Sequence, residues 1–180
     1  MTRSRVHALL TPCVLFVLAV PASAAAPEGK VACEVKENGE PASGTISLRQ
    51  GETEVASGPC GKPLSAPAGQ YTALIELDGA LDGPQQQQPV SVDAGKTAQV
   101  SAQFATGLLE VRIQSQGRDT AGMAVIRKDG KQIGTLGSGV AAHLSTGRYE
   151  VVARYRSQQK AFADVVIAAG QRTTLDAAFE

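Results

Sequence analysis

The sequence predicts an all-β protein in which two small β-sandwich modules follow one another behind an export signal. Three observations predict this fold: apolar residues alternate with polar ones, turn-forming residues recur at short intervals, and one pattern occurs twice. Alternation with a period of two is typical of strands that are buried on one face. Many short strands separated by turns indicate a sandwich or a small barrel. Beyond the N-terminal leader, no long window has helical periodicity.

The duplicated pattern is clearest around two Gly-x-Tyr segments, Pro67 to Leu77 and Ser145 to Tyr155. The sequence numbers of their glycines, Gly69 and Gly147, differ by 78 (147 − 69). Near the end of each copy the offset falls to 75, and the difference of three lies within Asp78 to Val90. We expect this segment to be a solvated loop between strands, where an insertion costs little.

The repeat divides the chain into a leader, residues 1–25, and two modules. Module 1 covers residues 29–104 and module 2 covers residues 107–180, so each copy is small but within the size that folds alone. Only Ala105 and Thr106 separate the modules, and so short a linker does not let them tumble freely. We therefore expect an end-to-end pair with a restricted angle.

Alternating or β-branched runs bounded by Gly, Pro and polar clusters predict five strands in each module. They are residues 31–35, 45–48, 71–77, 90–92 and 98–104 in module 1, and residues 109–113, 124–127, 149–155, 163–167 and 173–179 in module 2. Asp129-Gly130 is a good hairpin turn because both residues tolerate a positive φ. Gln85 to Gln88 lie between predicted strands, and we expect them to form a flexible loop.

Matching glycines and tyrosines are the candidate structural residues of the two modules. A tyrosine just after a sharp turn can bury its ring and bond its hydroxyl to nearby backbone, as a tyrosine corner does. Its recurrence favours this role over the alternative, a ligand-stacking tyrosine. The residues assigned to turns and core are Gly69, Tyr71, Gly95, Gly147, Tyr149 and Gly170.

The N-terminal segment, residues 1–25, has the pattern of a secretory signal peptide. Arg3 and Arg5 precede a mostly apolar run, Leu9 to Val20, and Ala22-Ser-Ala24 offers small residues for cleavage. The run is shorter than the roughly 20 residues that span a bilayer, which disfavours the alternative of a retained anchor. A lipoprotein is less favoured still, because Cys13 lies inside the apolar run. We expect export to the periplasm or outside the cell, with no stable membrane span after cleavage.

Charge limits the classes of partner, and the cysteine content predicts a disulfide. Without the leader, 17 − 2 = 15 basic and 17 acidic residues remain, a net charge of 15 − 17 = −2, and no basic cluster points to nucleic acid or to an anionic membrane. An even pair of cysteines in an exported chain, Cys33 and Cys60, is expected to form a disulfide. The separation of 27 (60 − 33) along the chain gives a chain-entropy stabilisation of about 3.5 kcal/mol.

The residues offer little reactive chemistry. His143 is the one histidine after the leader, which is too few for a histidine zinc cluster, and no nucleophile motif accompanies it. We expect a surface or turn-bonded role for it. Asp78 to Gly83 holds two acids and two glycines but lacks the other ligands of a calcium loop, so we expect a solvated turn. No catalytic, metal or cofactor site is therefore predicted, and the protein is not expected to be an enzyme.

Each module closes with a strand, an Ala-Gly pair and a last strand that ends in Phe, as in Val90 to Phe104 and Val165 to Phe179. With the Gly-x-Tyr segments, this pattern resembles the small prealbumin-like or immunoglobulin-like (Ig-like) β-sandwich repeats of bacterial envelope proteins. The closest groups are PEGA-type and carboxypeptidase-regulatory-like domains. The pattern also looks like the β-repeats that accompany some von Willebrand factor A proteins, but no metal motif of that domain is present.

This resemblance implies a non-catalytic envelope module that is structural or binds another protein. The alternative is a small-ligand or glycan binder that uses end loops, although the absence of Trp and the low aromatic content disfavour flat sugar platforms. A hydrolase of unrecognised type is the least favoured hypothesis. A protein partner is expected, but its identity and the oligomeric state do not follow from the sequence.

Overall fold

The computed structural model describes residues 26–180, and every regular element in this range is a β-strand. The predicted all-β fold is therefore confirmed. The predicted leader, including Cys13, lies outside the described residues. None of the residues from 26 onward forms a helix that could cross a membrane.

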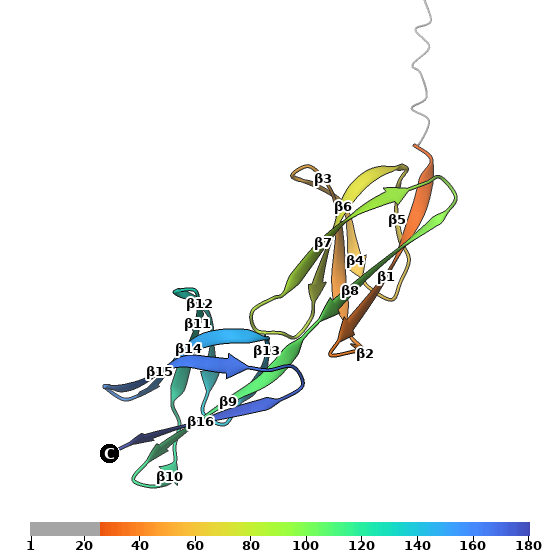
Figure 1. Cartoon of the computed structure of the whole chain (residues 1–180). Coiled ribbons are helices and arrows are strands. Elements are labelled where there is room, and N and C mark those ends of the chain that lie inside the picture. Colours follow the sequence, from red (N-terminus) through yellow and green to blue (C-terminus); the bar gives the residue numbers. More distant parts are fainter. Residues whose placement is uncertain (1–25) are drawn as a thin grey trace, which may run out of the picture.

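The first sandwich consists of two four-stranded sheets (Figure 1). In one sheet, β1 (Glu28–Glu37) pairs antiparallel with β2 (Glu40–Pro41) and β5 (Leu64–Pro67), and parallel with β8 (Thr97–Phe104). The other sheet has the order β4 (Thr53–Pro59), β3 (Gly44–Gln50), β6 (Gly69–Leu77) and β7 (Gln85–Val92).

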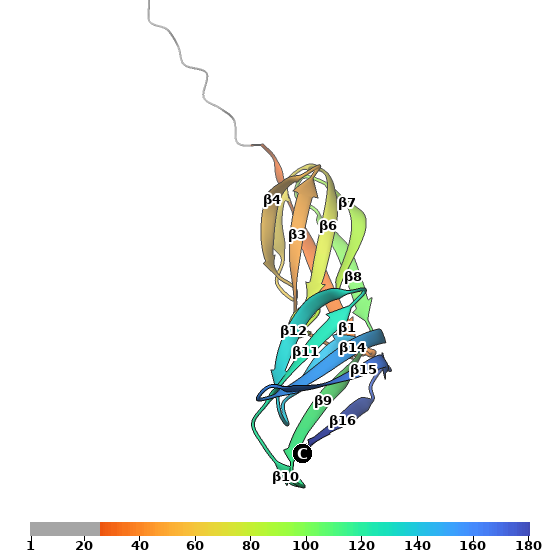
Figure 2. The same cartoon turned by 90° about the vertical axis from the view of Figure 1, so that its left-hand side faces the viewer.

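The second sandwich repeats the same plan, and the two sandwiches follow each other end to end (Figure 2). Here β9 (Thr106–Ser115) pairs antiparallel with β10 (Arg118–Asp119) and β13 (Ala141–Ser145), and parallel with β16 (Arg172–Phe179). The facing sheet has the order β12 (Lys131–Gly137), β11 (Met123–Lys128), β14 (Gly147–Tyr155) and β15 (Gln158–Ile167).

Each sandwich has a core of its own. Alternate residues of β6, from Tyr71 to Leu77, are buried, and in its counterpart β14 a buried run of three, Val151 to Ala153, follows the buried Tyr149. The buried side chains fall into one cluster between Val31 and Phe104 and another between Leu109 and Phe179. Burying one such aliphatic side chain stabilises the fold by about 1.5–3 kcal/mol, so each module is supported by its own set.

The ten predicted strands all lie within observed strands, most of which are longer. Six others were missed: β2, β4, β5, β10, β12 and β13. These are short or, like β4 and β12, mostly exposed, so no burial pattern marks them in the sequence. The predicted hairpin turn between β11 and β12 is confirmed, with φ values of 50° for Asp129 and 75° for Gly130.

The prediction of a flexible loop at Gln85 to Gln88 is wrong. These residues begin β7 and pair with β6. The side-chain amide of Gln88 donates to the Ser101 carbonyl of β8 at 3.1 Å, and that of Gln86 donates to the Gln103 carbonyl. Strand pairing and these two bonds across the edge of the sandwich order a run that looks like a polar linker.

The predicted disulfide joins β1 to the segment between β4 and β5, with the Cα atoms of Cys33 and Cys60 4.7 Å apart. The matching positions of module 2 are Val111 and Ser138. The backbone around the two pairs is bonded in the same way. The Gly61 amide donates to the Cys33 carbonyl, and the Gly139 amide donates to the Val111 carbonyl, both at 2.9 Å. In module 2 the Ser138 hydroxyl accepts from the Ile113 amide at 2.9 Å, so a hydrogen bond stands where module 1 has a covalent link.

Candidate functional site

The predicted structural tyrosines lie where turn and core meet. The Tyr71 hydroxyl donates to the Pro67 carbonyl at 2.9 Å, and the Tyr149 hydroxyl lies 2.8 Å from the Ser145 carbonyl. Both rings are buried. Gly69 lies against the ring of Tyr71, so a Cβ there would come within 3.3–3.4 Å of it.

Gly147 begins β14 with a φ of 151°. The remaining two predicted glycines form turns at the end of each module that is nearer the N-terminus. Gly95 and Gly170 have φ values of 70° and 67°, which side chains rarely adopt. The Gly95 amide donates to Glu28 and the Gly170 amide to Thr106, both at 2.8 Å. The two turns therefore fasten the last strand pair of each module to the start of its first strand.

Polar and charged residues converge where the two modules meet. We define this joint as loop 78–84 of module 1 together with the module 2 residues that it contacts, which include Lys128, His143, Ser145 and Tyr149. The Leu81 amide donates to the His143 carbonyl at 2.8 Å, and Ala80 forms a parallel bridge with the same residue. The Leu81 side chain packs against the core of module 2. The expectation of a solvated loop is thus wrong, because the insertion of module 1 is docked on its neighbour.

Asp82 is the polar centre of the joint, with a side chain that is only 5% exposed. Its carboxylate accepts from the Ser145 amide at 3.0 Å and lies 2.9 Å from the Tyr149 hydroxyl. The Lys128 ammonium lies 3.6 Å away and donates to the same hydroxyl at 3.2 Å. Because Tyr149 has one hydroxyl proton, it donates either to Asp82 or to Ser145. The Lys128 ammonium donates to the hydroxyl and lies close enough to Asp82 to form an ion pair with it.

The surroundings shift two pKa values in opposite directions. Burial alone would raise the pKa of Asp82, but the hydrogen bonds from Ser145 and Tyr149 and the charge of Lys128 outweigh it and hold this pKa below the ordinary value of 3.8. Burial, and then the hydrogen bond and charge of Asp82, raise the pKa of Tyr149 well above its ordinary value. At neutral pH the joint therefore holds a carboxylate and a neutral phenol.

A second group of contacts connects the end of β1 to the start of β9. Thr106 is fully buried. Its backbone carbonyl accepts from the Asn38 side-chain amide and its backbone amide donates to the same side chain, both at 3.0 Å. The Thr106 hydroxyl donates to the Glu37 carboxylate. That carboxylate also lies 2.8 Å from Nδ1 of His143. The His143 side chain is 45% exposed, so it lies at the surface as expected, but its ring also contacts Glu37 of the other module.

Sequence reasoning located the insertion but missed the joint. The signal that could have revealed it is Leu81, a large apolar residue in a loop otherwise made of Asp, Gly, Ala and Pro. A single apolar residue in a loop is common, so this signal is weak by itself. The partners of Asp82 lie 63 and 67 positions further along the chain, so no local pattern identifies them.

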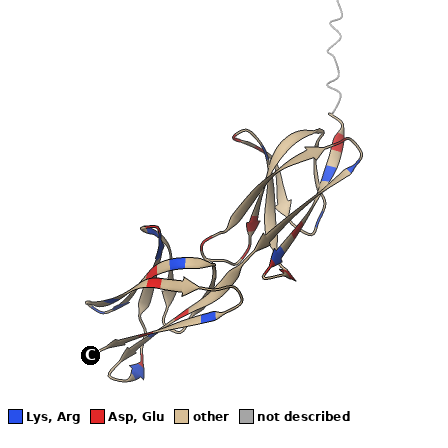
Figure 3. Ribbon diagram, viewed as in Figure 1, with Lys and Arg blue, Asp and Glu red and all other residues tan. Residues whose placement is uncertain are grey.

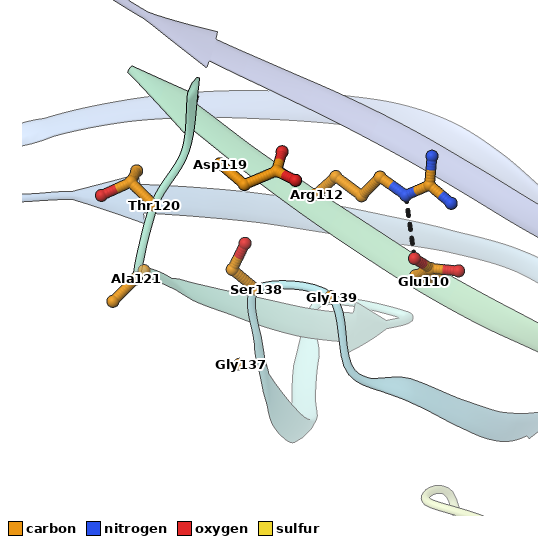
Figure 4. A pocket seen from close by; sticks show the side chains of 9 residues that line it. Glu110, Arg112, Asp119, Thr120, Ala121, Gly137, Ser138 and Gly139 are labelled. Atoms are coloured by element: carbon orange, nitrogen blue, oxygen red, sulfur yellow. Dashed lines mark hydrogen bonds and ion pairs between the residues drawn. The ribbon is translucent and has the colours of Figure 1, made fainter. Parts of the chain in front are cut away.

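A hollow of about 560 Å³ lies on module 2 between β9, β10 and the end of β12 (Figure 4). Two of its charged lining residues, Glu110 and Arg112, bind each other at 2.9 Å, and Arg172 from outside the lining binds the same carboxylate at 2.6 Å. These hydrogen bonds lower the pKa of Glu110. The third charged lining residue, Asp119, accepts from the Gln114 side-chain amide at 3.0 Å. Within residues 26–180 every buried side-chain N or O atom has a hydrogen-bond partner, and no group of three His, Cys, Asp or Glu is arranged to hold a metal. The hollow thus gives no specific support to a ligand site.

Fold and joint define the chain as a two-module β-sandwich protein whose modules are fastened by a buried polar contact. No protein-family model matches it, and no curated protein does. Among solved structures it is similar to a candidate cell adhesion protein from Bacteroides ovatus, with 8% identity, a TM-score of 0.41, and coverage of 87% of this chain and 94% of that one.

Two further solved structures are similar at the same level. One is the minor pilin of Streptococcus agalactiae, with 12% identity, a TM-score of 0.40, and coverage of 85% of this chain and 95% of that one. The other is the TIE protein of Bacillus anthracis, with 11% identity and a TM-score of 0.36. The match covers 86% of this chain but only 34% of the TIE protein, about a third of its length. Similarities this distant carry no information about what the chain binds.

Proposed function

We propose that the chain is an exported, non-catalytic structural protein of a bacterial envelope, and that its two modules form one rigid unit presented to another envelope protein. The observation that carries this proposal is the joint, where Leu81 and Asp82 of module 1 contact module 2. Modules in one chain move relative to each other unless their interface holds them. A joint that prevents this motion fixes the distance and the angle between the far ends of module 1 and module 2. A spacer or docking scaffold requires such a fixed geometry.

Physical chemistry supports a closed joint. A carboxylate that is almost fully removed from water is costly unless it is hydrogen-bonded, and Asp82 has its donors from module 2. Hydrogen bonds to a charged group are each worth about 1.5–3 kcal/mol. Because the two modules are covalently linked through Ala105, their effective concentration is high, and even a modest contact energy keeps the joint closed.

Export has support from two independent features. The segment 1–25 has the pattern of a cleavable leader. The Cys33–Cys60 disulfide is a feature of oxidising compartments outside the cytosol. Basic and acidic positions both occur along the ribbon of each module (Figure 3). This distribution favours a protein partner over nucleic acid or an anionic membrane.

The rigid unit can be tested by ¹⁵N relaxation on the mature chain. We expect both modules of the wild type to report one shared rotational correlation time. In a variant with Leu81→Ser and Asp82→Ala, each module should report a shorter time, because the short linker and the remaining contacts of Glu37 and Asn38 with His143 and Thr106 restrict the modules less than the closed joint does. Asp78→Ala is the matched control: this residue of the same loop is exposed, and its side chain accepts from Thr45 of the same module.

The partner can be tested by cross-linking in the envelope of the producing cell. If the fixed angle matters, a protein recovered with the wild type should be lost with the joint variant and retained with Asp78→Ala. Two modules that tumble independently in the wild type would refute the rigid unit. A wild-type chain that remains in the cytosol with its leader attached would refute export.

A further inference from the structure

The last strand of the chain, β16, has a free edge. Among residues 26–180 it pairs only with β9, and the carbonyls of Gln171 and Phe179 point toward that strand, where they accept from Leu108 and Gln116. Backbone groups alternate in direction along a strand, so the N–H and C=O groups of the residues in between point away from β9. The residues on this free edge are Arg172, Thr174, Asp176 and Ala178.

Module 1 closes the equivalent edge, and module 2 does not. In module 1, Gln86 and Gln88 of β7 bond the outward carbonyls of β8. Strand register places Lys160 and Phe162 of β15 at the corresponding positions, opposite Ala153 and Val151. Phe162 packs on the core and the Lys160 ammonium lies over its ring at 5.5 Å. Within residues 26–180 no side chain bonds the backbone groups of the β16 free edge.

The β8 edge is as regular as that of β16, but Gln86 and Gln88 bond its outward carbonyls. The remaining sheet edges of the described chain are short or interrupted. β7 contains Pro89, and β12 contains Gly134 and a register shift. β15 has a register shift and Asp164 at a positive φ of 54°. Prolines, bulges and very short strands are the features by which proteins protect their edges. In contrast, β16 runs from Arg172 to Phe179 in unbroken register without Gly or Pro.

We propose that two copies of the chain associate through this edge, with β16 of one copy antiparallel to β16 of the other and Thr174 on the two-fold axis. In this register Thr174 faces Thr174, and Arg172 of each copy faces Asp176 of the other. Thr–Thr and opposite-charge pairs are favourable cross-strand neighbours. A two-fold contact is self-complementary, and this charge pattern meets that requirement with two identical Arg–Asp pairs.

The charges around β16 are consistent with a second copy as the occupant. Arg172 binds Glu110 at 2.6 Å on one side, but its side chain remains 54% exposed. Asp176 lies opposite Arg112 in the register with β9, and its own outer side is exposed. The second copy would therefore continue an existing row of alternating charges across the sheet, with no like charges placed opposite each other. This association is independent of the joint, which lies elsewhere in module 2.

Sedimentation of the mature chain over a range of concentrations tests the proposal. We expect the wild-type mass to approach twice that of the chain. Thr174→Pro removes one outward N–H and breaks no bond within the chain, so it should weaken association by about tenfold or more while the monomer stays folded. The control is Ser101→Pro, which makes the same change on the outward side of β8 and should leave association unchanged.

Oxidative cross-linking gives a second, independent measurement. Opposed residues of such a pair have Cα atoms about 5.5 Å apart, within reach of a disulfide. Thr174→Cys should therefore yield a covalent dimer on mild oxidation, and Ser101→Cys should not. A chain that is monomeric at every concentration and does not cross-link through Thr174→Cys would overturn the proposal. Equal effects of the Thr174 and Ser101 changes, in either experiment, would overturn it as well.

Discussion

At the scale of single residues, Asp82 illustrates how a charge can be buried without destabilising the fold. Its carboxylate contacts an amide, a phenol and an ammonium, all of which belong to the other module. Tyr71 and Tyr149 occupy matching positions, yet only Tyr149 has this additional partner. The duplicated tyrosine thus keeps its role within the module, and in module 2 it also takes part in the contact between modules.

The first prediction concerns Asp82→Asn and pH. At neutral pH the variant should unfold with a free energy lower by about 2 kcal/mol, because a hydrogen-bonded charge is replaced by a neutral amide. The pKa of Asp82 is lowered in the folded chain, so its contribution is present above the ordinary value of 3.8 and is lost as pH falls through the lower folded value.

Denaturant unfolding of both proteins from neutral pH to about pH 2 checks this prediction. Other carboxylates destabilise both proteins in acid, so the relevant quantity is the difference between the two. That difference should shrink toward zero at the acid end. A difference that stays constant over the whole range would contradict the assigned role of the charge.

At the scale of elements, the two modules stabilise the same strand junction in different ways. Module 1 has a disulfide between β1 and the segment after β4, while module 2 has the Ser138 hydroxyl on the Ile113 amide. The backbone hydrogen bonds that accompany both junctions have the same length. The covalent link is therefore an addition to the module and not a requirement of its fold.

The second prediction follows from this equivalence. Val111→Cys together with Ser138→Cys should form a disulfide in module 2 and raise its free energy of unfolding by up to about 3.5 kcal/mol, the chain-entropy value for a loop of the same length. Mass spectrometry with and without reductant detects the bond, and thermal unfolding measures the gain. Cys33→Ala with Cys60→Ser is the reverse control and should destabilise module 1. Two free thiols after oxidation would show that the junctions differ in geometry.

At the scale of the whole molecule, loop 78–84 forms the contact by which module 1 docks on module 2. Leu81 fits between the core of module 2 and β12, where a Cβ on Gly134 would come within 2.6–2.8 Å of the leucine side chain. Overpacking of this kind typically costs about 1–3 kcal/mol. Gly134 therefore keeps space for a residue of the other module rather than serving a turn of its own.

The third prediction uses this close approach. Gly134→Ala should displace Leu81 and open the joint, seen as faster hydrogen exchange of the Leu81 amide, which bonds the His143 carbonyl. Gly137→Ala is the matched control in the same strand, since its Cβ would lie 3.5 Å from Val140, an ordinary contact. Unchanged exchange at Leu81 in the Gly134 variant would mean that the loop does not depend on this packing.

The sequence by itself determined the strand-rich architecture, the duplication and the cysteine pair. These features rest on local periodicity and on residues whose chemistry is specific, such as Asp129-Gly130 in a hairpin. It did not reveal the exposed strands, because an edge strand with little burial has no alternating pattern. Gln86 and Gln88 were misassigned for the same reason: their order comes from strand pairing and from bonds to β8.

Only the tertiary structure decided what the insertion in module 1 does. Leu81 and Asp82 lie in a segment with the composition of a solvated turn, and their contacts come from distant parts of the chain, such as Gly134 and Tyr149. The direction and burial of such side chains depend on how one module is placed against the next. That placement is a property of the packed molecule, because hydrogen-bond geometry and exclusion of water arise only when distant surfaces meet.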